Sequence, residues 1–199
     1  LPLLYLLVAL LAGCSTLGPT ETVKGPVALN KAIAETPENQ LLDVWIELFD
    51  PGELPEDEED AAGLSMDIRE AEARFIPEQL RATMETTGYW GAVRVVPRDI
   101  TGSELLVGGT IMASDGEQLV LQIRAYDATG LQWFERVYEQ ELIEGVYKAR
   151  NLLRNAPTED VFQSLYNTIA NDLAEFRRTL TERQVITIRQ VAELRFAAD

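Results

Sequence analysis

Residues 104–140 read ELLVGGTIMASDGEQLVLQIRAYDATGLQWFERVYEQ, and this stretch decides the fold. It holds three runs typical of β-strands, at 104–112, 118–127 and 131–140, separated by the turns SDGE and DATG. Asp and Gly in such short turns are typical of β-hairpins. In the middle run, Leu, Leu, Ile and Ala alternate with more polar residues, which predicts one buried and one solvated face. The stretch therefore predicts antiparallel hairpins.

The flanking segments add strands and helices. Residues 41–49 and 91–97 are further strand candidates, and residues 65–88 between them carry apolar residues at helical spacing. Pro77 should kink this helix or begin its second half, because proline has no amide donor. A second helix is predicted over 158–180. We expect an α+β (α/β-like) fold of order β-α-β-β-β-β-α, in which a mixed, mostly antiparallel five-stranded sheet has its helices packed on one face.

The amino-terminal residues 1–13, LPLLYLLVALLAG, form an apolar run that is too short to cross a bilayer as a helix. The run is typical of the hydrophobic part of a secretory signal peptide. It ends at Leu11-Ala12-Gly13-Cys14, where two small residues precede the only cysteine. This tetrapeptide resembles the bacterial lipoprotein box. The resemblance implies that residues 1–13 are removed and that Cys14 carries diacylglycerol and a further acyl chain such as palmitate. The alternative is a free or core cysteine.

Other features extend this hypothesis. Ser15, rather than Asp, follows the cysteine, which in lipoproteins of Gram-negative bacteria implies the outer membrane and a domain facing the periplasm. Residues 14–40 are expected to form a flexible tether that holds the domain roughly 25–30 Å from the lipid. The periplasmic domain is predicted over 41–180, and a carboxyl-terminal amphipathic helix over 181–199. Because no initiator Met and no helix stop are present, we expect the sequence to be truncated at both ends.

The composition restricts the function. The chain has 33 Asp and Glu against 17 Lys and Arg, a net charge of −16, which disfavours nucleic-acid binding. It contains no histidine, so serine triads, Cys-His pairs and zinc sites as usually built are excluded. A single cysteine excludes intrachain disulfides. We expect no enzyme activity, no cofactor and no metal.

Two groups of residues are candidates for binding. Between the first strand and the first helix lies an acidic loop that could dock a basic partner or, less in keeping with its spacing, hold Ca²⁺. Its carboxylates are Asp50, Glu53, Glu56, Asp57, Glu58, Glu59 and Asp60. The aromatic side chains of Tyr89, Trp90 and Trp133 are candidate partner contacts, although core packing is favoured because alternation places one member of each aromatic pair inside.

Two further motifs have simpler explanations. Glu47, Glu85 and Glu135 could supply a carboxylate pair for glycoside hydrolysis, but nothing in the sequence fixes the separation of any two. The pair Gly108-Gly109 lies within a strand, so a β-bulge or a close approach explains it better than a phosphate site.

The residues over 41–180 resemble a known group of envelope domains. The motifs are IPEQL at 76–80, TGYW at 87–90, LLVGGT at 105–110, AYDATG at 125–130 and the helix FQSLYNTIANDL at 162–173. They resemble the amino-terminal α/β domain of TolB and the related domains of the curli-secretion lipoprotein CsgG and of lipoprotein activators of peptidoglycan synthases. The resemblance implies a non-catalytic module that binds other envelope proteins. The alternative that it implies is a homo-oligomeric, ring-forming subunit of a secretion or transport assembly.

Overall fold

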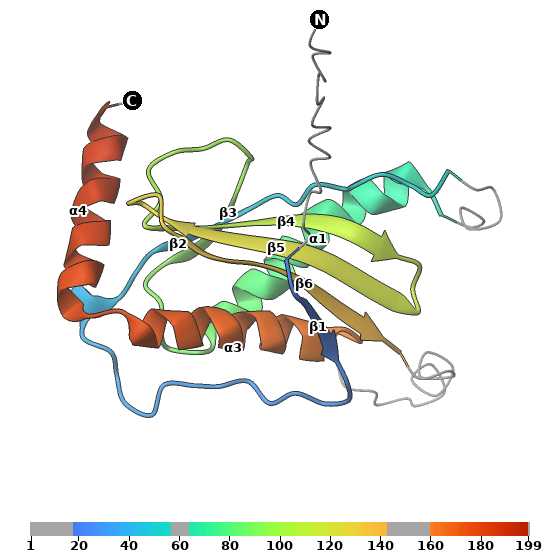
Figure 1. The fold of residues 1–199 in the computed structure, drawn as a ribbon, viewed down its shortest axis with the longest axis horizontal. Coiled ribbons are helices and arrows are strands. Elements are labelled where there is room, and N and C mark those ends of the chain that lie inside the picture. Colours follow the sequence, from blue (N-terminus) through green and yellow to red (C-terminus); the bar gives the residue numbers. More distant parts are fainter. Residues whose placement is uncertain (1–17, 57–63, 143–159, 199) are drawn as a thin grey trace, which may run out of the picture.

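The computed structural model describes residues 18–56, 64–142 and 160–198 and contains one mixed six-stranded sheet (Figure 1). The strand order across the sheet is β1-β6-β5-β4-β2-β3. The strands are β1 (Thr20–Val23), β2 (Val44–Glu47), β3 (Val93–Val96), β4 (Leu105–Ser114), β5 (Gln118–Asp127) and β6 (Gln132–Glu141). The helices are α1 (Met66–Glu85), α3 (Gln163–Thr179) and α4 (Glu182–Ala198), with a short 3₁₀ helix η1 (Glu38–Gln40).

The α+β class and the mixed sheet are confirmed, whereas the strand number is corrected from five to six. β4, β5 and β6 form the two long antiparallel ladders that the stretch 104–140 predicts. Three shorter ladders are parallel, because β2 pairs in parallel with both β3 and β4, and β1 pairs in parallel with β6. The carboxyl ends of β2 and β3 therefore point the same way.

The sixth strand lies inside the segment predicted as a tether, so that prediction is wrong from Thr20 onward. β1 pairs with β6 from Thr20 opposite Val137 to Val23 opposite Gln140, and the Val23 side chain is buried. The chain then runs along α3, where Asn167 Nδ2 donates to the Val27 carbonyl at 2.7 Å. Asn171 and Ser164 of α3 hold the same segment through its backbone.

Helices α1 and α3 cover one face of the sheet (Figure 1). On the central strands, side chains that alternate along the backbone point to this face, and Leu119, Leu121 and Ile123 of β5 are almost fully buried there. They belong to the same core as Leu80 of α1 and Ile169 of α3. The other face, the open face of the sheet, carries half-buried and exposed side chains.

The segment predicted as a carboxyl-terminal amphipathic helix forms α4, which packs through Val185 and Ile188. Arg189 Nε lies 3.4 Å from Glu104 Oε1, and Glu104 Oε2 accepts a 2.7 Å hydrogen bond from the Asp43 amide. Burial raises the pKa of the Glu104 carboxyl above its ordinary value. No helix within the described ranges has both the length and the apolar character that a membrane span requires.

Candidate functional site

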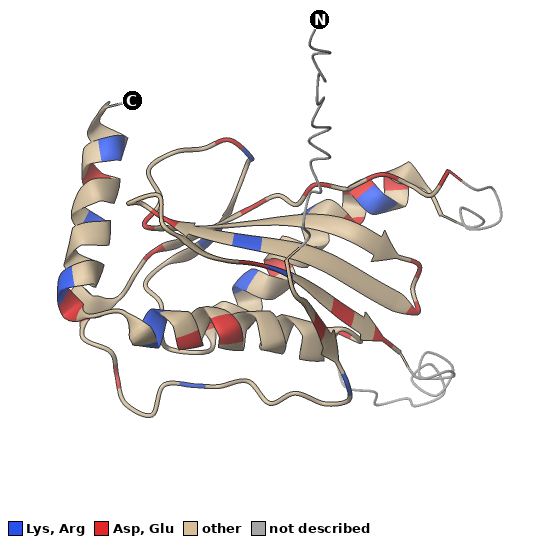
Figure 2. Cartoon of the chain, viewed as in Figure 1, with Lys and Arg blue, Asp and Glu red and all other residues tan. Residues whose placement is uncertain are grey.

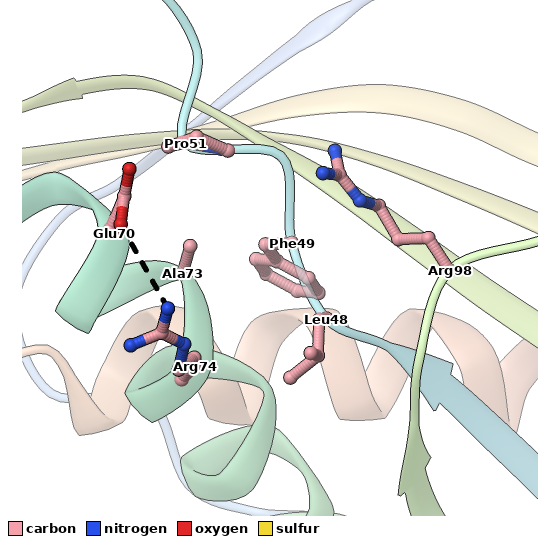
Figure 3. Close-up of a pocket in the computed structure, with 7 residues that line it drawn as sticks. All are labelled: Leu48, Phe49, Pro51, Glu70, Ala73, Arg74 and Arg98. Atoms are coloured by element: carbon pink, nitrogen blue, oxygen red, sulfur yellow. Dashed lines mark ion pairs between the residues drawn. The ribbon is translucent and has the colours of Figure 1, made fainter.

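A pocket lies where β2 and β3 end, on the side of α1 (Figure 3). Ligands of sheets with parallel strands bind preferentially at the carboxyl ends of those strands. The cavity has a volume of about 200 Å³. We call it the strand-end pocket, and its lining residues are Leu48, Phe49, Pro51, Glu70, Ala73, Arg74 and Arg98.

Pro77 leaves a backbone carbonyl of α1 free to bind the floor of the strand-end pocket. Pro77 lies inside α1, which runs without interruption from Met66 to Glu85, so it does not begin a second helix. In a regular helix the carbonyl of Ala73 would accept a hydrogen bond from residue 77, but proline has no amide hydrogen. That carbonyl instead accepts a 3.0 Å hydrogen bond from the Phe49 amide. The hydrogen bond from Phe49 to Ala73, which the proline makes possible, joins the end of β2 to the middle of α1.

The Phe49 ring occupies the space that a side chain at position 109 would need. Phe49 is only 2 % exposed, and a Cβ atom built on Gly109 would lie 2.6 Å from its Cζ atom. Gly108-Gly109 was predicted to mark a bulge or a close approach, and the structure shows a close approach at Gly109. The irregularity of β4 falls between Ile111 and Ala113 instead.

Asp50 is held beside the strand-end pocket by hydrogen bonds and does not lie on a free loop. Its amide donates to the Gly109 carbonyl at 2.8 Å, and its carbonyl accepts from the Ile111 amide at 2.9 Å. Its Oδ1 atom accepts from the Gly52 amide, and its Oδ2 atom lies 3.0 Å from Arg98 Nη1. Asp50 therefore pairs with Arg98 beside the cavity.

Two guanidinium groups stand on opposite sides of the cavity (Figure 3). Arg98 follows β3 and pairs with Asp50, while Arg74 of α1 lies 3.8 Å from Glu70. Acidic and basic residues are interspersed along α1 (Figure 2). The Arg74 and Arg98 side chains are 69 % and 51 % exposed, so each pair contributes about 1 kcal/mol or less and opens easily. The pocket thus offers an apolar floor and two cations that an incoming carboxylate can reach.

The chain was compared with known proteins. No family model matches it, and no curated protein matches it. The chemistry of the site consequently rests on its own residues. A cavity of about 200 Å³ is smaller than the roughly 300–1,000 Å³ of typical small-molecule pockets, and it suits one or two side chains of a protein partner.

Among the described residues, none of the predicted binding residues lines the strand-end pocket, and Asp50 alone pairs with a lining residue, Arg98. Glu53 and Glu56 are exposed on the loop that follows it. Cys14 and the loop carboxylates Asp57, Glu58, Glu59 and Asp60 lie outside the described residues. Within the described part of the chain, no group of three or more Cys, Asp or Glu side chains is arranged to hold a metal ion.

The predicted aromatic contacts are largely part of the core. Trp90 and Trp133 are 6 % and 5 % exposed, which is the core packing favoured for them, and neither presents a surface to a partner. Trp133 stacks on Phe176 with ring centroids 4.8 Å apart, and its Nε1 donates to Asp127 Oδ2 at 3.0 Å. Tyr89 is half-buried against the core.

The three candidate glutamates do not lie close to one another. Glu85 lies on α1 and pairs with Arg81, whereas Glu47 and Glu135 lie on the open face of the sheet. β5 and β4 stand between their strands, a separation of about 14 Å at 4.8 Å per strand. Carboxylate pairs of glycosidases are about 5–9.5 Å apart.

Sequence reasoning missed Phe49, Arg74 and Arg98 as site residues. Phe49 lies two residues after the end of β2, and Arg98 lies two residues after the end of β3. Their positions could have been found from the rule that ligands gather at the ends of parallel strands, had the parallel pairing of β2 and β3 been recognised.

Proposed function

We propose that the protein is a lipoprotein anchored in the outer membrane, whose periplasmic domain binds other envelope proteins and catalyses no reaction. The observation that carries the proposal is the apolar run that ends in Leu11-Ala12-Gly13-Cys14 with no other cysteine in the chain. Two or three acyl chains on Cys14, at about 0.8 kcal/mol per buried methylene, make a stable anchor.

The strand-end pocket supports a binding role. It combines an apolar floor at Phe49 with exposed guanidinium groups at Arg74 and Arg98. Arginine beside an apolar pocket is typical of the centres of protein interfaces. The pocket suits a partner segment that places a small apolar side chain next to a carboxylate.

Cys14→Ala is expected to move the protein from the membrane fraction to the soluble fraction and to abolish incorporation of labelled palmitate, because the acylated thiol is lost. Fractionation and metabolic labelling measure both effects. The matched control is Ser15→Ala, which changes the neighbouring residue and should remain in the membrane fraction. Membrane association that survives Cys14→Ala would refute the anchor.

The double variant Arg74→Glu, Arg98→Glu is expected to reduce capture of the partner by about tenfold, the equivalent of 1.4 kcal/mol. Capture is measured by cross-linking the acylated protein in envelope preparations. The control Arg178→Glu, Arg183→Glu makes the same two charge reversals at exposed positions of α3 and α4. Equal capture by all variants would exclude the strand-end pocket as the contact. A stable ring of identical copies in light scattering would instead favour the ring-forming subunit.

A further inference from the structure

The folded domain begins only a few residues after the proposed anchor. Gly18 lies against β6 so closely that a Cβ atom on it would be 2.1 Å from the Glu135 carbonyl oxygen. The next residue, Pro19, accepts a 3.1 Å hydrogen bond from the Val137 amide, and β1 starts at Thr20. The point where the chain joins the domain is therefore fixed at the edge of the sheet.

The connection to the anchor is short. Only Ser15, Thr16 and Leu17 separate Cys14 from Gly18. A fully extended chain spans about 3.3–3.6 Å per residue, so the Cys14 Cα atom lies at most about 14 Å from that of Gly18. The polar headgroup layer of a bilayer is itself about 5–8 Å thick on each side. Little room remains between the lipid and β1.

We infer that the β1 edge of the sheet lies against the lipid headgroups, and that the opposite edge, β3, faces away from them. This inference rests on the lipid anchor proposed above. Five strand spacings of about 4.8 Å separate β1 from β3, so β3 stands about 24 Å farther from the membrane.

The charge of the β1 edge fits a lipid surface. Among the exposed residues of this edge, Thr20 and Thr22 are uncharged, and Glu21 is balanced by Lys24. The outermost strand therefore adds no net charge that would repel anionic headgroups, and Glu139 and Glu141 lie one strand farther in, on β6. Arg98, which follows β3, is on the far side, so the strand-end pocket opens where a partner can reach it.

The orientation is testable with single cysteines, because the acylated Cys14 leaves no free thiol in the wild-type chain. Thr22→Cys and Arg94→Cys place one exposed thiol on β1 and one on β3, both on the open face of the sheet. Each acylated variant is labelled with a fluorophore. It is then reconstituted into vesicles of phosphatidylethanolamine and phosphatidylglycerol that carry a nitroxide on a fraction of the headgroups.

The expected result is quenching several-fold stronger at Thr22→Cys than at Arg94→Cys. An insert of about twelve Gly and Ser residues after Leu17, which adds roughly 20 Å, should remove the difference while the protein still floats with the vesicles. Equal quenching of the two labels in floating protein, or stronger quenching at Arg94→Cys, would overturn the orientation and leave the anchor intact. Protein that fails to float would overturn the anchor and the orientation together. Thr20→Cys replaces Thr22→Cys if that variant folds poorly.

Discussion

Trp133→Ala is expected to lower the free energy of unfolding by about 3–5 kcal/mol. The side chain is 5 % exposed, stacks on Phe176 and lies 6.3 Å from the Trp90 ring, so its removal leaves a large cavity. It also removes the donor to Asp127 Oδ2, on a side chain that is itself 5 % exposed. Urea unfolding followed by circular dichroism measures the change.

Trp133→Phe separates the two contributions. Phenylalanine keeps an aromatic ring in the core but cannot donate to Asp127, so a smaller loss of about 1–3 kcal/mol is expected. The Thr129 amide donates to Asp127 Oδ1 at 2.8 Å, and this bond is expected to remain in the variant. If the free energy of unfolding of Trp133→Ala lies within about 1 kcal/mol of the wild-type value, Trp133 is not a packed core residue. It would then again be a candidate for contact with a partner.

Gly109→Ala is expected to lower the free energy of unfolding by about 1–3 kcal/mol. The new Cβ atom would lie 2.6 Å from the Phe49 ring, which cannot withdraw freely because its own amide is bonded to the Ala73 carbonyl. The same change should weaken binding at the strand-end pocket, because Phe49 forms its floor. Thermal and urea unfolding measure the first effect.

Gly108→Ala is the matched control for this substitution. The two glycines are neighbours on β4 but face opposite sides of the sheet. A Cβ atom on Gly108 would lie 3.0 Å from Glu47 Oε2, the end of a flexible side chain that can move, so a loss below about 1 kcal/mol is expected. Phe49→Leu combined with Gly109→Ala should be less destabilised than the sum of the single changes. Equal losses for the two alanines, or strict additivity, would refute the clash.

The long hairpins could be predicted because their signal is local. In the stretch 118–127 alternating side chains and good turn residues on both sides describe the strand without reference to the rest of the chain. β1 gives no such signal, since only Val23 of its residues is buried and its partner β6 lies far along the sequence. Its pairing depends on backbone groups that every residue carries.

The candidate site was predictable only in part. The sequence placed an acidic loop directly after the strand at 41–49, but it could not show that Asp50 is tied to Gly109 and Arg98. Those contacts exist because β4 and the end of β3 lie beside β2, which is a property of the topology. The proline in the first helix was recognised as a break in hydrogen bonding, whereas the donor that compensates for it was not.

The hydrogen bond between Phe49 and Ala73 has a consequence for binding thermodynamics. Because Pro77 cannot donate to the Ala73 carbonyl, this hydrogen bond has no competitor from residue 77, and we expect the floor and the helical wall of the pocket to keep one spacing when a partner binds. A partner that binds in this pocket does not have to order the pocket first, so little affinity is lost. The domain should therefore contribute only a small entropic penalty to the association.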